Sequence, residues 1–332
     1  MKINKSYVCE KLGRTLNFLP DRVSFCCSYA EGPGLKYEKG MTLNLKEITK
    51  SEMQFIKLLK NGKIPAQCSG CIDYKEKKYN NFFEFLFSKQ SSMLINEIIV
   101  NHFKQCDCNC VYCSQKIIWG DETQQNYELL PIIKELFKAD SIDKNNLKVE
   151  FQGGNVSVLS EFEPLMQEFL NNGCKYFTIL TNGIKYLSVI EKTNSMSGII
   201  FRLIISLDSG TKETFAKIKQ IDAFDEVIKN IKEYGIKTGA IITLKYILIK
   251  DINDNSREVE NFLNLAKELR CIHSLCFDID YRDILFDKSK NFKVLVHYGD
   301  LIEQARKFCM ENRINFVLLP YAEQYIENNK KV

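Results

Sequence analysis

The sequence predicts an α/β protein built on a parallel β-sheet, and three observations carry this prediction. From residue 93 onward, short apolar segments alternate with amphipathic helices. The connections between these segments are short, and parallel neighbours require a crossover helix. Polar motifs follow several of the apolar segments, at the strand ends where α/β sheets bind their ligands. The alternation by itself fits a doubly wound sheet and a partial barrel equally well.

Six strands are expected in this region, each as an apolar segment rich in β-branched or aromatic residues. They cover residues 94–100, 147–151, 176–180, 202–207, 240–244 and 275–279. Between them, apolar residues at helical spacing predict helices over 162–170, ended by Gly173, and over 224–231, ended by Gly235. A third helix begins near Ser256. A further helix at 301–312 and a strand at 314–319 extend the sheet or close the barrel side.

The first 90 residues form a cysteine-containing module. A strand, a turn at Pro20-Asp21 and a second strand predict a hairpin that ends at Cys26 and Cys27. A helix is expected over 51–59. The module then reaches Cys68-Ser-Gly-Cys71, and a C-x2-C pair with glycine in its spacer is a common way to offer two thiolates to a metal.

Composition is that of an ordinary globular protein, with 45% hydrophobic and 27% charged residues. The net charge of +4 comes from lysines spread along the chain, so nucleic acid is not indicated as a partner. No apolar signal core and no stretch of about 18 apolar residues is present, which predicts a cytoplasmic protein with no membrane partner. In a reducing compartment, 13 cysteines favour metal binding or catalysis over disulfides.

The most informative segment carries Cys106, Cys110 and Cys113 in a C-x3-C-x2-C spacing. One loop with this spacing can bind three irons of a cuboidal iron-sulfur cluster and leave the fourth without a protein ligand. At this cysteine content, chance would produce only about 0.02 such triplets. A zinc knuckle on the same thiolates would need a fourth ligand, for which Cys108 or His102 is available. Cys108 lies off the spacing and is interpreted as a passive loop cysteine.

At this segment the sequence resembles the radical S-adenosylmethionine (radical SAM) enzymes, whose motif also has an aromatic residue before the last cysteine. Tyr112 fills that position. The resemblance covers residues 93 to 282 and implies a partial (β/α)6 TIM-type barrel that binds a 4Fe-4S cluster and S-adenosylmethionine. It also implies that the Tyr112 ring packs beside the cluster while its backbone approaches the adenine of the cofactor.

Two further motifs resemble cofactor-binding segments of the family. Gly153-Gly154-Asn155, after the second barrel strand, resembles the family's GGE motif, whose backbone receives the amino group of S-adenosylmethionine. Asn155 replaces the usual acid, but backbone contacts do not depend on that side chain. Ser206 and Asp208 resemble the family's ribose-binding strand end, and alternating strand side chains place both on one face. Alternatively, Asp208 caps the helix that starts near Thr211.

Other strand ends supply three more candidates. Asn182 lies in a polar turn after the third barrel strand and faces the same rim. Lys245, at the end of the fifth strand, is expected to pair with the cofactor's carboxylate, or else to be solvated. Asp278 and Asp280 lie near the sixth strand, and Asp280 is the candidate for a base on the substrate side.

The N-terminal module resembles the auxiliary-cluster half of a SPASM domain. A cysteine precedes the Pro-Asp turn, a second cysteine follows it, and a short helix then leads into the C-x2-C pair. Arg22 replaces the family's glycine, the module precedes the core, and the family's further cysteines are missing. The expected ligands of a second iron-sulfur cluster are Cys9, Cys26 or Cys27, Cys68 and Cys71. A structural zinc on the same thiolates and unliganded core cysteines are the alternatives.

We therefore predict an auxiliary module at residues 1–90, a radical SAM core barrel at 91–290 and a C-terminal extension at 291–332. The enzyme would cleave S-adenosylmethionine reductively to a 5'-deoxyadenosyl radical that abstracts hydrogen from a peptide or small polar metabolite, in a maturation or an oxidation. A flavodoxin or ferredoxin would be the reductant. The alternative is an iron-sulfur electron carrier or redox sensor, which has no need for the cofactor-binding strand ends.

Overall fold

The computed structural model describes residues 6–9, 13–26, 33–37, 43–60, 63, 74–77, 94–120, 127–193, 196, 198–280, 282, 297–319 and 322–323. The chain divides into two compact units. The first contains Met1–Gln105 and Ile118–Phe177, and the second contains Cys106–Ile117 and Thr178–Val332. The bounds of the three predicted domains stay predictions. Each unit is described in turn.

The first unit contains a sheet with the strand order β7-β6-β2-β3-β4. Its strands are β2 (Thr15–Leu19), β3 (Arg22–Ser24), β4 (Gly34–Lys36), β6 (Glu97–Val100) and β7 (Lys148–Phe151). β6 and β7 are parallel, and β2 and β3 form the predicted antiparallel hairpin. β2 also pairs in parallel with β6, which the sequence did not predict. The N-terminal hairpin therefore joins the sheet of the first barrel strands.

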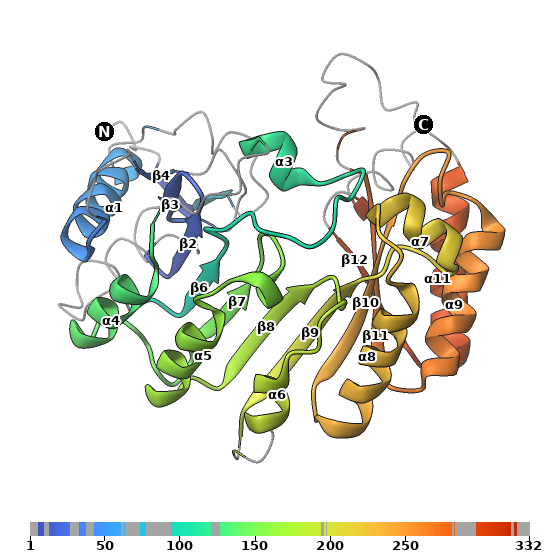
Figure 1. Ribbon diagram of the computed structural model, residues 1–332. Coiled ribbons are helices and arrows are strands. Elements are labelled where there is room, and N and C mark those ends of the chain that lie inside the picture. The colour runs from blue at the N-terminus through green and yellow to red at the C-terminus, as the bar shows by residue number, and fades with distance from the viewer. Residues whose placement is uncertain are drawn as a thin grey trace. The chain divides into compact units, whose positions relative to one another are not determined.

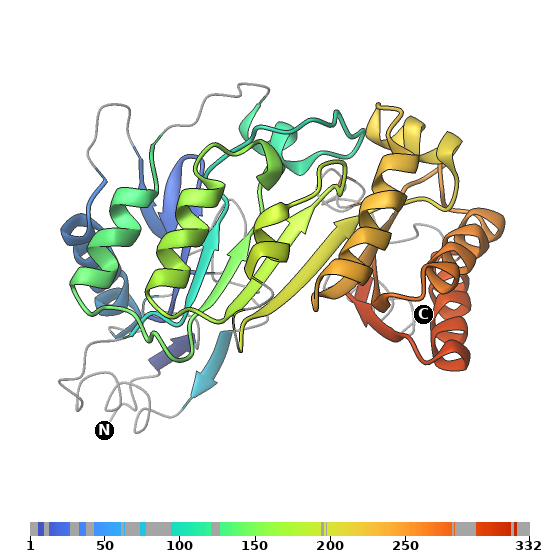
Figure 2. The same cartoon turned by 60° about the horizontal axis from the view of Figure 1, so that its bottom comes forward.

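Helices α1 (Leu45–Lys60), α4 (Leu130–Lys138) and α5 (Phe162–Asn171) belong to this unit (Figure 1). α5 matches its prediction, and its Phe162 and Phe169 rings pack on Phe151 of β7 at 5.1 and 6.3 Å. α1 begins six residues before the predicted start because Asn44 accepts a hydrogen bond from the Glu47 N–H at 3.1 Å. A separate antiparallel pair, β1 (Ser6–Cys9) with β5 (Tyr74–Lys77), is visible at the blue end of the chain in Figure 2.

The second unit contains the remaining strands in the order β8-β9-β10-β11-β12. They are β8 (Tyr176–Thr181), whose last four residues fall in this unit, β9 (Ile200–Ser206), β10 (Ile241–Leu248), β11 (Ile272–Ile279) and β12 (Asn315–Leu318). β9, β10, β11 and β12 are parallel. The predicted strands and the parallel α/β class are thus confirmed, and β12 extends the sheet beyond β11.

The helices of the second unit are α6 (Ser188–Thr193), α7 (Lys212–Lys219), α8 (Phe224–Lys237), α9 (Ser256–Leu269) and α11 (His297–Asn312). α9 and α11 lie side by side (Figure 1), with the Ser256 hydroxyl 3.0 Å from the Gln304 side chain. One face of the sheet packs on α9 through Tyr246, Phe262 and Phe277.

The predicted end of α8 at Gly235 is wrong, because the helix continues to Lys237. A Cβ atom at Gly235 would lie 2.5 Å from the Cβ of Cys271. The glycine therefore permits close packing inside the helix instead of ending it.

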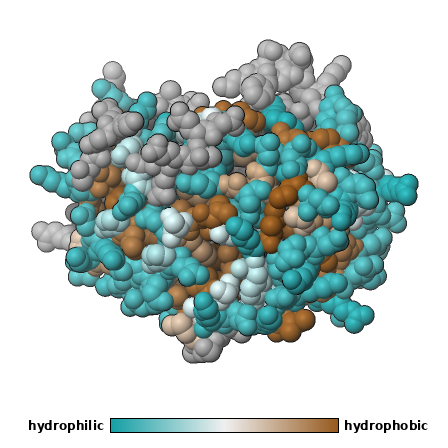
Figure 3. Space-filling model, viewed as in Figure 1, coloured by the Kyte–Doolittle hydropathy of each residue, from teal (hydrophilic) through white to brown (hydrophobic). Residues whose placement is uncertain are grey.

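No helix in the described part of the chain is long and apolar enough to cross a membrane. On the face shown in Figure 3, hydrophobic residues form small groups among hydrophilic ones. Isolated groups of this kind are normal on protein surfaces.

Candidate active site

The three-cysteine loop, residues 106–113, belongs to the second unit and is attached to the end of α7. The backbone N–H groups of Asn109 and Val111 donate to the carbonyls of Lys219 and Ile218 at 3.1 and 3.0 Å. The Val111 side chain also packs against an apolar cluster that contains Ile218 and Ile247. The loop is therefore held by backbone and side-chain contacts at a fixed place beside the sheet.

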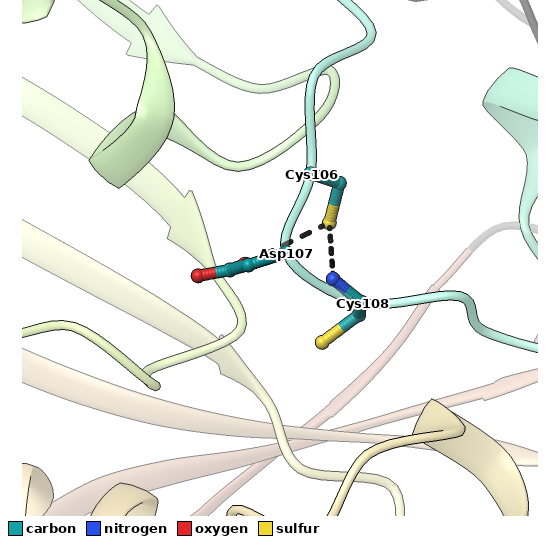
Figure 4. A group of neighbouring side chains, drawn as sticks. All are labelled: Cys106, Asp107 and Cys108. Atoms are coloured by element: carbon teal, nitrogen blue, oxygen red, sulfur yellow. Dashed lines mark hydrogen bonds between the residues drawn. The ribbon is translucent and has the colours of Figure 1, made fainter.

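The first part of the loop brings two thiols together. In Figure 4 the backbone N–H of Cys108 points at the sulfur of Cys106, at 3.4 Å. The two sulfurs and a carboxylate oxygen of Asp107 lie within 4.8 Å of one another. Asn182, just after β8, donates to the Cys108 sulfur at 3.2 Å and to Asp107 at 2.5 Å. The predicted rim residue Asn182 thus contacts the loop directly. Although Cys108 does not fit the motif spacing, its sulfur lies beside that of Cys106.

Two of the three motif thiols, those of Cys106 and Cys110, have a lowered pKa. The pKa of Cys110 is lowered to about 6 by a hydrogen bond with the Cys108 thiol, which outweighs burial, and the Lys219 ammonium lowers it further. A hydrogen bond with Cys108 also lowers the pKa of Cys106, whereas burial raises the pKa of Cys113. Soft thiolate sulfurs are the ligands that iron-sulfur clusters use. The donor set of this loop therefore fits the cluster that the motif implies.

Asp208 lies fully buried behind the loop, two residues after the end of β9, in a left-handed backbone conformation with φ of 60°. One carboxylate oxygen accepts the Ile247 N–H at 2.9 Å. The other accepts the Lys219 ammonium at 2.5 Å and the Tyr112 hydroxyl. Its predicted contact with ribose stays a prediction. The alternative role as a helix cap is wrong, because Thr211 caps α7 by accepting from the Thr214 N–H.

A row of polar side chains crosses the sheet on the face opposite α9. Lys245 on β10 is in register with Ser206 on β9 and with Cys276 on β11, so these three side chains share one face. Asp278 lies two residues further along β11, on the same face. Burial raises the pKa of Cys276 to about 12, and the pKa of Asp278 to about 6, with Lys245 acting in the opposite direction on both. A hydroxyl, an ammonium, a thiol and a carboxyl group therefore line one surface.

The raised pKa of Asp278 makes stability depend on pH. Because the folded protein binds this proton more tightly than the unfolded chain, the stabilising contribution is present below about pH 4 and is lost as pH rises through about 6. We expect Asp278→Asn, which cannot ionise, to gain up to about 3 kcal/mol relative to the wild type across that window. Urea denaturation at a series of pH values measures the difference, with Asp300→Asn at an exposed helix position as the control. A constant difference between pH 4 and 7 would contradict the assignment.

Asp280, the predicted base, is 2% exposed and paired with Arg282. Nε of Arg282 lies 2.7 Å from one carboxylate oxygen, Nη2 contacts the same oxygen, and the Arg282 N–H donates to the other at 3.0 Å. Nη1 of Arg282 donates to the Val111 carbonyl at 2.6 Å. The carboxylate therefore holds a cation that reaches the cysteine loop, and its role as a base stays a prediction.

The glycine pair lies in the first unit, after β7. Gly153 has φ of +113°, and a Cβ on Gly154 would lie 2.0 Å from the carbonyl oxygen of Gln105. The N–H groups of Gly154 and Asn155 donate to the carbonyls of Phe103 and Gln105 at 3.1 and 2.7 Å. The glycines are needed for this contact with the segment that directly precedes Cys106 in the chain. The predicted contact of their backbone with the cofactor stays a prediction.

We expect Gly154→Ala to destabilise the protein by about 3 kcal/mol, because the new methyl group must displace a backbone carbonyl. The loss is measured as a lower midpoint of urea denaturation. Gly299→Ala is the control, since a Cβ there has no heavy atom within 4 Å. A Gly154→Ala protein with wild-type stability would show that the backbone is free to move at this turn.

The predicted auxiliary ligands lie mostly beyond the described residues. Cys27, Cys68 and Cys71 fall in segments that the structure does not describe, and of Cys9 only the backbone is described. Cys26 follows β3, whose Ser24 hydroxyl donates to the Cys26 carbonyl at 3.3 Å. The pairing of β1 with β5 sets Cys9 opposite Tyr74, three residues after Cys71 in the sequence.

The fold and the three-cysteine loop define an α/β protein with a group of thiols beside a parallel sheet. The family model of the Radical SAM superfamily matches residues 100–266, half of the chain. The chain belongs to the radical SAM superfamily, whose members bind a 4Fe-4S cluster and S-adenosylmethionine and depend on a reductant and a substrate.

Several curated relatives carry the name GTP 3',8-cyclase. The protein of that name from Helicobacter pylori is 25% identical over 72% of this chain and 77% of its own length. The one from Clostridium acetobutylicum is 32% identical over 50% of each chain. Other relatives are matched over less of their length, as with the probable GTP 3',8-cyclase of Sulfurisphaera tokodaii, of which the match spans 53%.

Solved structures show the fold. SuiB of Streptococcus suis, determined with its precursor peptide SuiA, has a TM-score of 0.54 at 16% identity, over 82% of this chain and 62% of SuiB. Native anSMEcpe with bound AdoMet has a TM-score of 0.50 at 17% identity, over 67% of this chain and 63% of that protein. At these identities the likeness supports the expected barrel-type fold and carries no information on the substrate.

Proposed function

We propose that Cys106, Cys110 and Cys113 hold a 4Fe-4S cluster at which the enzyme cleaves S-adenosylmethionine reductively. The observation that carries this proposal is the C-x3-C-x2-C loop within the matched superfamily region, and hydrogen bonds with Cys108 that lower the pKa of Cys106 and of Cys110 support it. When bound, the cluster supplies the electron that breaks a carbon-sulfur bond of the cofactor. The three-cysteine spacing would leave one iron open to the cofactor's amino and carboxylate groups.

The chain's own residues would bind and orient the cofactor. The backbone of Gly153 and Gly154 is proposed to receive the amino group, and the Ser206 hydroxyl to contact the ribose. Lys245, in register with Ser206, is proposed to attract the carboxylate of the cofactor or an anionic group of the substrate. The Tyr112 hydroxyl donates a hydrogen bond to Asp208, and the Tyr112 side chain packs against the apolar group of Ile218 and Ile247 beside the loop.

For the substrate, we propose a small polar metabolite in preference to a peptide. Support comes from the relatives named GTP 3',8-cyclase and from the polar face that carries Lys245 and Asp278. An ammonium and a carboxyl group on one surface suit a ligand with anionic and hydrogen-bonding groups, such as a nucleotide. GTP is accordingly the first compound to test, with an unmodified peptide as the comparison.

We further propose a second iron-sulfur cluster on Cys9, Cys26, Cys68 and Cys71, with Cys27 as the rival of Cys26. The β1–β5 register supports it, because Cys9 pairs with Tyr74, and Tyr74 follows Cys71 by three residues in the sequence. Zinc on the same thiolates remains the competing assignment, because zinc accepts four-cysteine sites of similar spacing. The reductant is proposed to be a flavodoxin or ferredoxin.

The test is direct. The protein is reconstituted with iron and sulfide under anaerobic conditions, mixed with dithionite and S-adenosylmethionine, and assayed for 5'-deoxyadenosine by mass spectrometry. Formation of 5'-deoxyadenosine that depends on iron and dithionite supports the proposal, and a rise on addition of GTP supports the substrate class. Protein that binds four irons and never yields 5'-deoxyadenosine would instead favour an electron carrier.

A further inference from the structure

A buried lysine outside the cysteine motif connects the loop to the sheet. The side chain of Lys219 is 1% exposed, and its ammonium lies 2.5 Å from Asp208 and 3.0 Å from the Tyr112 hydroxyl. Its carbonyl accepts the Asn109 N–H at 3.1 Å. One residue at the end of α7 therefore contacts the loop twice, once on each side of Cys110.

The side chains of Lys219, Asp208 and Tyr112 are hydrogen-bonded to one another. One carboxylate oxygen of Asp208 accepts a hydrogen bond from the Ile247 N–H of β10. The other oxygen accepts hydrogen bonds from the Lys219 ammonium and the Tyr112 hydroxyl. A buried charge is tolerated only when paired and hydrogen-bonded, and an ion pair of this kind adds little net stability compared with apolar residues of the same size. The geometry that the pair imposes is therefore its main physical consequence. Here it fixes where the Tyr112 hydroxyl, and with it the loop, must lie.

A second cation, Arg282, binds the backbone of Val111, the residue before Tyr112. Arg282 is held by Asp280 through three contacts and donates from Nη1 to the Val111 carbonyl at 2.6 Å. The N–H of Val111 is already bound to the Ile218 carbonyl at 3.0 Å. Val111 and Tyr112 are the two residues between Cys110 and Cys113. Both are thus anchored, each by a cation with its own carboxylate.

We propose that Lys219 and Arg282 are positioning residues that set the separation of Cys110 and Cys113 before any cluster is bound. Asp208 and Asp280 serve as their counter-ions, so both carboxylates act on the loop through these two cations. The inference rests on the proposed function, because a positioned loop matters only if it binds a cluster. The ordering of the loop is nevertheless a property of the metal-free protein, so an experiment on that protein tests the inference separately from the proposed function.

The first measurement is hydrogen exchange of the Asn109 and Val111 amides in metal-free protein. Lys219→Met alone leaves Asp208 buried without its cation and is expected to destabilise the whole protein. The double variant Asp208→Asn with Lys219→Met removes the charge pair together and is expected to fold. In that double variant, exchange of both amides should rise at least about tenfold, because the loop opens locally without its anchor.

Matched variants isolate the cause. Tyr112→Phe removes only the hydroxyl that Lys219 and Asp208 hold, and should raise exchange at Val111 by a smaller factor. Arg282→Gln combined with Asp280→Asn tests the second anchor in the same way. Lys212→Met, at the exposed start of the same helix, where the lysine pairs with Asp222 and Asp225, should leave both amides unchanged.

A second readout follows the assembled site. In the folded double variant, reconstituted protein should bind fewer irons, and the electron paramagnetic resonance signal of the reduced cluster should shift less on addition of S-adenosylmethionine. Wild-type amide protection together with a wild-type spectrum in the double variant would overturn the inference. Lost protection in a protein whose wild type never cleaves S-adenosylmethionine would uphold the positioning role and reject the proposed function.

Discussion

Cys110→Ala should abolish formation of 5'-deoxyadenosine. Removal of one of three ligands leaves the cluster with two thiolates, which do not hold a cuboidal cluster with a single open iron. Cys110 is also the motif cysteine whose pKa is lowered to about 6, so the variant loses the thiolate most favoured at neutral pH. The assay is the anaerobic reaction with dithionite and S-adenosylmethionine, with iron content measured on the same sample. The expected result is a product signal no higher than that of the metal-free protein.

Cys108→Ala is the matched control from the same loop. Its thiol donates hydrogen bonds to its neighbours and its pKa is raised, so it behaves as a supporting group and not as a ligand. This variant should keep its iron and retain product formation at a reduced rate. Loss of iron in Cys108→Ala with retention in Cys110→Ala would show that the cluster uses a different set of thiols from the motif.

Cys68→Ala should halve the iron content of the reconstituted protein. Two 4Fe-4S clusters correspond to about eight irons per chain, and loss of the auxiliary site leaves about four. Because the three-cysteine loop is untouched, cleavage of S-adenosylmethionine without substrate should continue, while turnover of the true substrate should stop. Iron and sulfide analysis of the purified protein, followed by the 5'-deoxyadenosine assay, measures both effects.

The control for this experiment is Cys174→Ala. Cys174 is 2% exposed in the first unit and belongs to no cysteine motif, so its variant should keep the wild-type iron count. Zinc in anaerobically purified protein, in an amount of about one per chain and lost in Cys68→Ala, would assign the N-terminal thiolates to a structural metal instead.

Much of the fold could be predicted because apolar periodicity is a local property. β7, β8, β9, β10 and β11 lie where alternating apolar segments indicated, and α9 begins at the predicted residue. The errors occurred where a distant neighbour decides the outcome. Gly235 was expected to end α8, but its lack of a side chain serves the contact with Cys271 instead.

In the candidate site, too, the residues of a local motif could be predicted and those that depend on distant neighbours could not. The cysteine spacing predicted the metal chemistry, because the proposed ligands lie in one short segment and their separation along the chain limits their separation in space. Lys219 and Arg282 could not be identified, since neither belongs to a motif and each reaches the loop only after folding. The ion pairs of Asp208 with Lys219 and of Asp280 with Arg282 could not be predicted for the same reason.

By itself the sequence predicted the succession of strands and helices of an α/β chain, the superfamily, and the three thiols that we propose as cluster ligands, all of which depend on spacing along the chain. Only the tertiary structure decided which charges face one another. It joined β2 to β6, paired the buried carboxylates with Lys219 and Arg282, and aligned Lys245 with Cys276. Long-range pairing of this kind depends on burial and register, and these arise only when distant segments pack together.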